Sequence, residues 1–379
     1  MLILDNKGKT VFAKDAQTVT SLVKGNMGTV KKGNVYLSCE EAMYLIDIRN
    51  AECKLNFSEL MNKPSKYYGY KAWRDRGLYI IDFKNSETQK EILKIMPPLK
   101  AKEYKGSKIK LPKIKLKGTF FSKDLMTILD NFEDSAKELY YEYWFGQLGT
   151  YKSEHRGKFL HFDIYETIYL IKKKILSTNK DIESIIKTAK RKHKFFDLMY
   201  NVYEEWRNKG YVLKTGFKFG SHFRLYLPGA APKASDKKWM HSKHVLHIFP
   251  YTSKLLISEW SRAIRVAHSV RKTFILAIPK NDKDKMKNVS LDFLLYHRKK
   301  DNVCKPKEDS PKYVMWNLGE EEYIGGAELA YALNEAKKMG LGLILAISDR
   351  ETSVTFYNVK KIKLPKSKYE YYEIEWVQP

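Results

Sequence analysis

The chain has 379 residues, with 70 Lys and Arg against 44 Asp and Glu, so its formal net charge is +26. Apolar residues make up 43% of the chain and aromatic residues 13%, which is enough to build cores and excludes bulk disorder. The charge excess predicts a polyanionic partner, and nucleic acid is the usual one for such a chain. A solvated basic surface is the alternative.

Two classes of protein are disfavoured at once. The longest apolar runs, 273–278 and 341–347, have the length of core strands, so we expect neither a membrane span nor a signal peptide. The cysteines Cys39, Cys53 and Cys304 lack CxxC or Cys/His spacing, which argues against a disulfide framework or a zinc knuckle. The sequence therefore predicts a cytoplasmic protein.

The N-terminal half contains two copies of one pattern, and such a repeat defines the organisation of a chain. The first copy reads GNMGTV at 25–30 and LSCEEAMYLI at 37–46, and the second reads GQLGTY at 146–151 and FDIYETIYLI at 162–171. In each copy a short β-like edge leads into an amphipathic helix, with Ser38 or Asp163 suited to cap its N-terminus. We expect two small α/β lobes, and lysine-rich insertions such as 187–194 in the second.

The segment between the two lobes reads as an extended linker. It starts with Pro97 and Pro98, and a lysine follows every two or three residues from Lys100 to Lys117.

The C-terminal half repeats as well. Residues 258–278 match residues 327–347, and each copy reads as a helix followed by a buried strand. Upstream, FRLY at 223–226 resembles FLLY at 293–296, which would open the second copy with the same strand. Residues 289–296 could instead close the first copy.

These repeats predict an α/β (α+β) fold of tandem small mixed lobes, arranged as three pseudo-units with duplicated N-terminal and C-terminal lobes. The expected boundaries are an N-lobe of a non-catalytic unit at 1–96, the lysine-rich linker at 97–118, the N-lobe of a catalytic unit at 119–210, its C-lobe at 211–286 and a degenerate C-lobe at 287–379.

The first C-lobe contains GFKFGSHFRLY at 216–226 and HSKHVLHIF at 241–249, which read as two strands joined by a long loop. His241, His244 and His247 are spaced three apart, as metal ligands can be. On a strand, however, His244 points away from the other two, and no Cys, Asp or Glu completes a shell. We therefore predict no metal and no cofactor.

A helix is predicted over 258–271, with Ile264, Ala267 and Val270 facing a core and the basic residues Arg262 and Arg265 on another side.

Lys272 follows this helix directly. A lysine at such a place is usually a helix C-cap or a solvated side chain. The repeat favours a special role, because the other C-lobe has Leu341 at this position and roughly Asp309 at that of His241, while Tyr296 matches Tyr226.

Tyrosine, histidine and lysine suit metal-free cleavage of RNA by its own 2′-hydroxyl. The reaction needs a base for the 2′ proton, an acid for the leaving 5′ oxygen and a cation near the crowded phosphate. Tyr226, His241 and Lys272 can fill these roles in that order. Tyrosine is a poor base at its ordinary pKa of about 10, so Tyr226 would need Lys272 or another cation nearby.

The blocks 216–226, 241–247 and 265–272 resemble the three signature blocks of the archaeal tRNA-splicing endonucleases, and the similarity extends over essentially the whole chain. The resemblance implies that Tyr226, His241 and Lys272 form a catalytic triad. It implies metal-free cleavage of both strands of a bulge-helix-bulge in precursor tRNA, with 2′,3′-cyclic phosphate and 5′-hydroxyl ends. It also implies that Arg265 stacks on a bulge base.

The three-unit layout resembles the fused form of the family that pairs with itself, so we expect a homodimer. The hairpin with Asp349 and Glu351 resembles the family's loop that docks in a basic groove of an opposing unit; a plain β-turn is the alternative.

The sequence departs from the common family pattern in the longer loop at 227–240. It is either a harmless surface loop or an RNA-binding element. We assign Lys218, Arg262, Lys237 and Lys238 to substrate binding.

Two other functions stay open: a metal-dependent DNA nuclease and a non-catalytic RNA-binding subunit. The first is disfavoured because the middle unit lacks a D…ExK-like carboxylate set beside Lys272, and the second because all three triad members are present.

Overall fold

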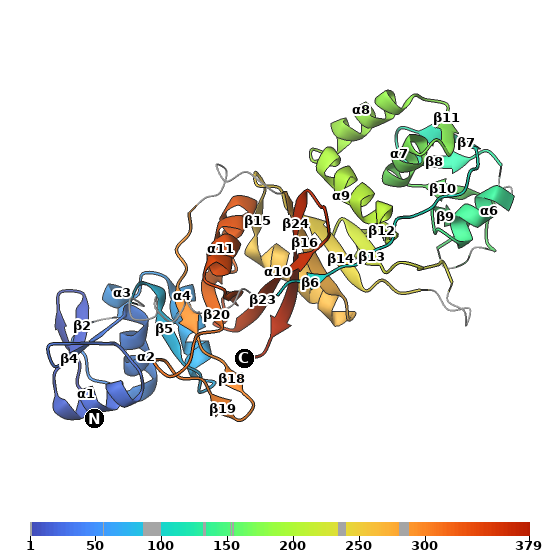
Figure 1. Ribbon diagram of the computed structural model, residues 1–379. Helices are drawn as coiled ribbons and strands as arrows, with labels where there is room; N and C mark the ends of the chain where they lie inside the picture. Colours follow the sequence, from blue (N-terminus) through green and yellow to red (C-terminus); the bar gives the residue numbers. More distant parts are fainter. Residues whose placement is uncertain are drawn as a thin grey trace.

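The computed structural model describes residues 2–55, 57–85, 100–131, 134–151, 153, 155–233, 240–279 and 288–379. The chain has a mixed α/β fold, as predicted, in which a long central sheet carries one small lobe at each end (Figure 1). Lys237 and Lys238 lie outside the described residues.

The first lobe is a four-stranded sheet in the order β1-β2-β4-β3, packed against helices. Its elements are β1 (Asp5–Lys7), β2 (Thr10–Ala13), α1 (Ala16–Lys24), β3 (Thr29–Lys31), β4 (Asn34–Leu37), α2 (Cys39–Arg49), α3 (Phe57–Leu60) and α4 (Pro64–Arg74).

The second lobe is a five-stranded sheet in the order β11-β7-β8-β10-β9, covered by helices. Its elements are β7 (Leu116–Phe121), β8 (Met126–Leu129), α6 (Asp134–Tyr141), β9 (Gln147–Leu148), β10 (Leu160–Phe162), α7 (Ile164–Lys172), β11 (Leu176–Thr178), α8 (Ile182–Lys192) and α9 (Phe196–Asn208).

The repeated helices of the two lobes begin in the same way. Ser38 caps α2 and Asp163 caps α7, and each forms a capping box with the glutamate three residues later, Glu41 or Glu166. Each glutamate also accepts a hydrogen bond from a glycine N–H, at 2.9 Å from Gly28 and at 3.0 Å from Gly146.

These contacts correct one detail of the sequence comparison. Gly28, rather than Gly25, is the structural counterpart of Gly146, because both contact the capping glutamate and both have positive φ, 72° and 78°. A Cβ atom on Gly28 would lie 2.5 Å from Val35, so the position has room only for glycine.

The central sheet runs in the order β12-β13-β14-β16-β24-β23-β22-β20-β17-β5, with β6 added beside β23. Its strands are β5 (Ile80–Asp82), β6 (Lys102–Glu103), β12 (Val212–Thr215), β13 (Phe223–Tyr226), β14 (His244–Ile248), β16 (Thr273–Pro279), β17 (Phe293–Leu295), β20 (Tyr313–Gly319), β22 (Gly342–Ser348), β23 (Val354–Lys363) and β24 (Tyr369–Val377).

The pattern of strand pairing is the same when followed inward from either end of the sheet. On one side β13 pairs antiparallel with β14, which pairs parallel with β16; on the other side β17, β20 and β22 repeat that arrangement. Strand β17 thus pairs with β20 of the second copy and with β5, and not with β16. The two halves meet where β23 pairs with β24.

Two matching helices cover one face of the sheet, α10 (Ile257–Ser269) and α11 (Gly326–Lys338), and each follows a strand of the two-stranded pair β15 (Lys254–Leu256) and β21 (Tyr323–Gly325). Both helices pack into one core with strands of both halves. Helix α10 ends earlier than predicted, so Val270 lies beyond it and is 46% exposed instead of facing the core.

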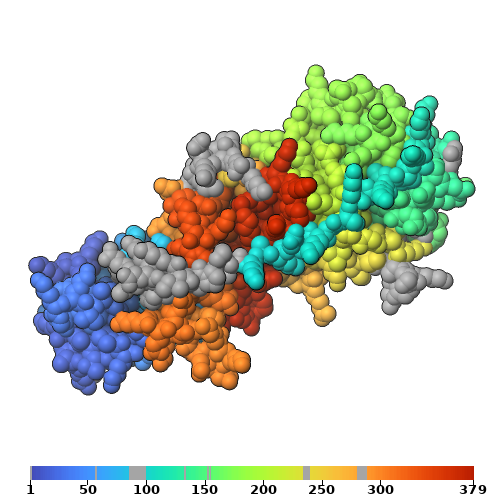
Figure 2. Space-filling view, in the orientation of Figure 1, coloured from blue at the N-terminus to red at the C-terminus, as the bar shows by residue number. Residues whose placement is uncertain are grey.

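The linker is held against the molecule rather than hanging free. Strand β6 pairs parallel with β23, residues 104–115 have no helix or strand, and β7 begins at Leu116, within the predicted linker. Its Ile109, Leu111 and Ile114 pack against the core of the second lobe. Figure 2 shows this segment crossing the surface, in teal.

The smaller elements are the 3₁₀ turns η1 (Phe83–Asn85) and η2 (Phe217–Phe219) and the hairpin of β18 (Arg298–Lys299) and β19 (Asn302–Val303). None of the described helices is long and apolar enough to cross a bilayer.

Candidate active site

The three residues of the predicted triad meet at one edge of the central sheet. Tyr226 ends β13, His241 lies just before β14, and Lys272 lies just before β16. Because β13 runs antiparallel to β14, and β14 parallel to β16, the end of the first strand and the starts of the other two share this edge.

A groove of about 520 Å³ contains all three side chains, and we call it the triad groove. Its lining residues are Tyr151, Phe219, Arg224, Tyr226, Met240, His241, Ser242, Lys243, Val270, Arg271 and Lys272.

Lys272 is fixed by the turn between α10 and β16. Arg271 has φ of 56°, and the Lys272 N–H donates to the carbonyl of Ala267 at 2.9 Å, so the backbone reverses direction here. The buried ammonium Nζ donates to the carbonyl of Ser242 at 2.7 Å, next to His241. The lysine therefore points into the site, and its side chain is not a helix cap.

Tyr226 is only 3% exposed, and its ring packs against Trp144 with centroids 4.7 Å apart. Burial raises the pKa of its hydroxyl, while the Arg224 charge and a hydrogen bond with Ser242 act in the opposite direction. The cation that the sequence argument required beside the tyrosine is thus Arg224, whose guanidinium carbon lies 5.9 Å from the ring centroid.

His241 is exposed, whereas the other two histidines of its motif have structural contacts. The Nε2 atom of His244 lies 3.3 Å from the Tyr104 hydroxyl of the linker, and the His247 ring packs at a tilt against His222 with ring centroids 4.3 Å apart. Burial lowers the pKa of His244 and of His222 to about 4. Among the described residues, no group of three His, Cys, Asp or Glu is placed to hold a metal ion.

The other predicted substrate-binding residues are dispersed. Lys218 is exposed and does not line the groove, but its ammonium lies 4.6 Å from the centroid of the Tyr151 ring, which does. Arg262 and Arg265 are exposed on α10 and do not line the groove; Arg265 acts electrostatically on Tyr357 of β23 instead.

The hairpin between β22 and β23 is exposed and self-contained. Asp349 accepts backbone hydrogen bonds from Glu351 at 3.0 Å and from Ser353 at 2.9 Å, so its carboxylate closes the turn. Arg350 pairs with Glu320 and Glu321 of the same chain. Glu351 remains exposed at the tip.

Sequence reasoning missed Tyr151 and Trp144, which come from the second lobe and contact the site from outside the three motifs. Tyr151 lines the triad groove, and its hydroxyl accepts a hydrogen bond from Arg224 at 3.3 Å. Tyr151 ends the repeated GQLGTY segment and Trp144 lies two residues before it, so the repeat was the available signal.

A second pocket, of about 250 Å³, adjoins the triad groove at Tyr226, and we call it the lobe pocket. It shares Tyr151, Arg224, Tyr226 and Met240 with the triad groove. The rest of its lining is Met126, Trp144, Gly146, Gln147, His161, Phe162, Asp163, Glu166, Lys214 and Thr215.

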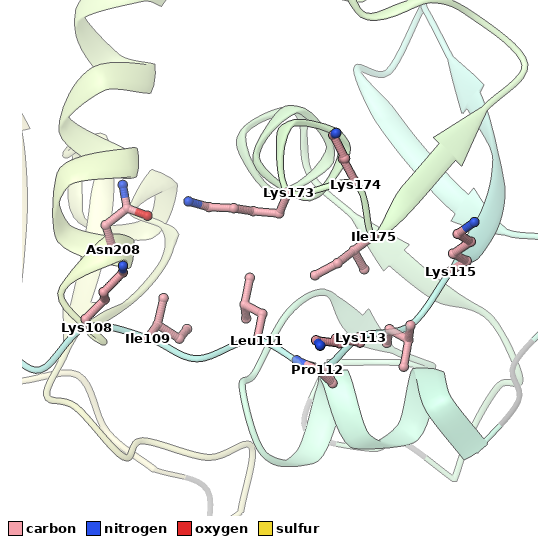
Figure 3. Close-up of a pocket in the computed structure, with 11 residues that line it drawn as sticks. Lys108, Ile109, Leu111, Pro112, Lys113, Lys115, Lys173, Lys174, Ile175 and Asn208 are labelled. Carbon is pink, nitrogen blue, oxygen red and sulfur yellow. The ribbon is translucent and has the colours of Figure 1, made fainter.

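A larger groove, of about 670 Å³, lies between the linker and the ends of α7 and α9 (Figure 3). We call it the lysine groove, because its lining includes five lysines and no carboxylate: Lys108, Lys113, Lys115, Lys173 and Lys174. In Figure 3, Lys173 extends across the groove toward Asn208. The five like charges favour an anionic occupant.

Two comparisons with known proteins bear on the family of this chain. Residues 196–288 match the family model of the tRNA intron endonuclease, catalytic C-terminal domain, and this range contains all three triad residues. The chain is similar to the tRNA-splicing endonuclease of Pyrococcus abyssi, with 32% identity over 157 residues, which are 40% of this chain and 83% of that protein.

The same name applies to two further relatives. The Pyrococcus furiosus protein is 34% identical over 35% of this chain and 75% of its own length, and the Methanococcoides burtonii protein is 34% identical over 45% of this chain and 47% of its own length.

Fold, site and relatives together define an endoribonuclease of tRNA processing. The chain belongs to the tRNA-splicing endonuclease family, also called the tRNA intron endonucleases.

Proposed function

We propose that this chain removes introns from precursor tRNA by cutting bulge-helix-bulge junctions without a metal ion, and leaves 2′,3′-cyclic phosphate and 5′-hydroxyl ends. The observation that supports it is the meeting of Tyr226, His241 and Lys272 in one groove at one sheet edge. The set supplies a base, an acid and a cation, as cleavage by the 2′-hydroxyl requires.

In this mechanism Tyr226 accepts the 2′ proton while the 2′ oxygen attacks the phosphorus. Because burial raises its pKa, the tyrosine is protonated in the free enzyme, and substrate must bind while Arg224 stabilises the minor tyrosinate. At neutral pH, therefore, only a minor fraction of Tyr226 is in the deprotonated form that can act as the base.

His241 then protonates the leaving 5′ oxygen as the P–O bond breaks. Its exposure lets it exchange protons with water between turnovers. The Lys272 ammonium, held by the Ser242 carbonyl, stabilises the negative charge on the phosphate oxygens as they crowd around phosphorus.

We further propose that the chain is the three-unit form, with the domain boundaries given above, and that two chains pair. The sheet order that reads alike from both ends supports a duplicated C-lobe, and the paired capping boxes support a duplicated N-lobe. One triad groove per chain then gives two for the two scissile strands. Arg265, which does not line its own groove, is free to contact RNA on the other copy.

RNA contacts extend beyond the triad groove in this proposal. The exposed side chains of Lys218, beside Tyr151, and Arg262 on α10 contact phosphates, and we retain Lys237 and Lys238 as part of the substrate-binding surface. The lysine groove adds a phosphate-binding surface on the linker side of the second lobe.

The test is cleavage of an intron-containing precursor tRNA in EDTA, followed by analysis of the product ends. Full activity with cyclic phosphate ends is the expected result. Activity that disappears on chelation and returns with Mg²⁺ would contradict the metal-free mechanism and favour the metal-dependent alternative. Binding without cleavage under all conditions would favour a non-catalytic subunit.

A further inference from the structure

We propose that the lobe pocket is a nucleobase subsite, and that it takes the base of the nucleotide directly 5′ to the scissile phosphate. This inference rests on the proposed function, because it uses the role of Tyr226 as the base. It adds a substrate contact from the second lobe, outside the motifs that carry the triad.

The position of the pocket decides which nucleotide it receives. Tyr226 lines both the triad groove and the lobe pocket, whereas His241 and Lys272 line the triad groove alone. The tyrosine faces the 2′-hydroxyl of the nucleotide 5′ to the cut, and the histidine faces the 5′ oxygen of the nucleotide 3′ to it. A ribose at Tyr226 therefore places its own base beside the lobe pocket, on the side away from His241.

The size and lining of the pocket suit one base. Its volume of about 250 Å³ is below the range of pockets for drug-sized ligands, roughly 300–1,000 Å³. Among its aromatic side chains Trp144 and Phe162 are almost or fully buried, and Tyr151 presents an exposed ring. Flat apolar surfaces of this kind stack with nucleobases of any sequence.

The entrance is formed by a ring that is exposed yet held in place. Tyr151 is 45% exposed and lines both cavities. Lys218 lies 4.6 Å and Arg224 5.8 Å from its ring centroid, and Arg224 also donates a hydrogen bond to its hydroxyl. A preorganised aromatic ring at the junction of the two cavities offers a stacking face to an unpaired base.

Polar groups inside the pocket can contact the edge of the base. Gln147 and His161 come from the paired strands β9 and β10, and both line the pocket. Gln147 is the amide among them, and its side chain can donate to or accept from the edge of a base.

The experiment compares two RNAs that differ in one base. A bulge-helix-bulge RNA is made with the intact nucleotide 5′ to the scissile phosphate, and again with that base removed while the ribose and its 2′-hydroxyl remain. For the unaltered enzyme we expect kcat/KM to fall about tenfold or more on base removal, the usual size of one base–aromatic contact.

Variants of the pocket then test where the base binds. Tyr151→Ala removes the entrance ring, and Thr215→Phe fills the pocket from its exposed edge. Each should reduce the ratio of kcat/KM for the intact RNA to kcat/KM for the RNA without the base toward one. The matched controls Tyr151→Phe and Thr215→Ser, which keep the ring or the space, should retain it. Removal of the base 3′ to the cut should have the same effect in all of these proteins.

The outcomes separate this subsite from the proposed function. If the unaltered enzyme cleaves the intact RNA and the RNA without the base with equal kcat/KM, the enzyme has no such subsite. If the ratio keeps its original value in both pocket variants, the base does not bind in the lobe pocket. Failure to cleave the intact RNA at all would instead contradict the proposed function.

Discussion

Tyr226 and His241 differ most in their exposure to solvent, and this difference matches the two proton transfers proposed for them. The tyrosine is almost buried against Trp144, whereas the histidine is exposed at the start of its strand. A buried base is sheltered from water while it waits for the substrate, and an exposed acid recovers its proton quickly.

At this scale we predict that His241→Ala lowers the single-turnover cleavage rate by about two to four orders of magnitude, the usual worth of one positioned acid. RNA binding should be nearly unchanged, because the side chain has no structural contact among those described. Filter binding and single-turnover cleavage of a precursor tRNA measure both quantities. A large loss of binding would show that His241 has a structural role.

A second prediction at the residue scale concerns acid stability. Burial lowers the pKa of His222 to about 4, below the unfolded value of 6.5, so the folded protein favours the neutral ring. The unfolded chain therefore binds more protons between pH 6.5 and 4, and the free energy of unfolding falls as pH falls through this window. The His222 contribution is about 3 kcal/mol at most.

Denaturant unfolding at several pH values checks this. His222→Asn, which keeps an acceptor for the Ile248 N–H, should make the loss of stability between pH 6.5 and 4 shallower. His155→Gln is the control, because His155 is exposed. An unchanged pH dependence in the His222 variant would contradict the prediction.

At the scale of elements, one buried ion pair connects the second lobe to the strand that leads into the active site. Lys214 of β12 donates to Glu166 of α7 at 2.6 Å and to the carbonyl of Gly146 at 2.7 Å. The same glutamate is the capping-box partner of Asp163. The pair therefore joins a helix start, a glycine turn and the central sheet.

We predict that Lys214→Met lowers the free energy of unfolding by about 3–5 kcal/mol, because it leaves the Glu166 carboxylate buried without its partner. The double variant Lys214→Met, Glu166→Gln should recover much of this loss, since it removes both charges. Thermal or urea unfolding of the three proteins measures the coupling. Equal stability of the single and double variants would contradict the predicted coupling.

At the scale of the whole molecule, the role of the hairpin tip in the proposed homodimer can be tested. Because Asp349 closes its own turn, its substitution would disturb the hairpin itself, and Glu351 is the cleaner position. We predict that Glu351→Lys weakens assembly and cleavage together while each chain stays folded. Sedimentation at working concentration measures the mass, and Asp301→Lys, on another exposed hairpin, is the control. A fully active monomer would refute the dimer.

The lysine groove makes a further prediction at this scale. Substitution of Lys108, Lys113 and Lys173 by Gln should weaken binding of precursor tRNA and reduce the slope of log K against log salt by about 0.7–0.9 for each lost phosphate contact. The cleavage rate of bound RNA should be unchanged. Substitution of the exposed Lys7, Lys9 and Lys31 in the first lobe is the matched control. If the substitutions changed the mass of the protein assembly and left its RNA affinity unchanged, the groove would bind protein instead.

The local and repeated features of this protein could be predicted from its sequence. Capping residues act within one turn of helix, so Ser38 and Asp163 could be recognised as helix starts without the rest of the fold. The repeats also predicted the mixed α/β class, because similar segments adopt similar local structure. The fusion, the dimer and the roles of the triad remain predictions.

Which distant groups meet depends on the folded structure. The strand pairing brings residues 226, 241 and 272 to one edge, selects Arg224 as the cation near Tyr226, and places Tyr151 and Trp144 of the second lobe against the site. Hydrogen bonds to the capping glutamates identify Gly28 as the counterpart of Gly146, and the early end of α10 leaves Val270 exposed. The physical reason is that such contacts depend on register and packing between elements, which periodicity and spacing along one chain do not encode.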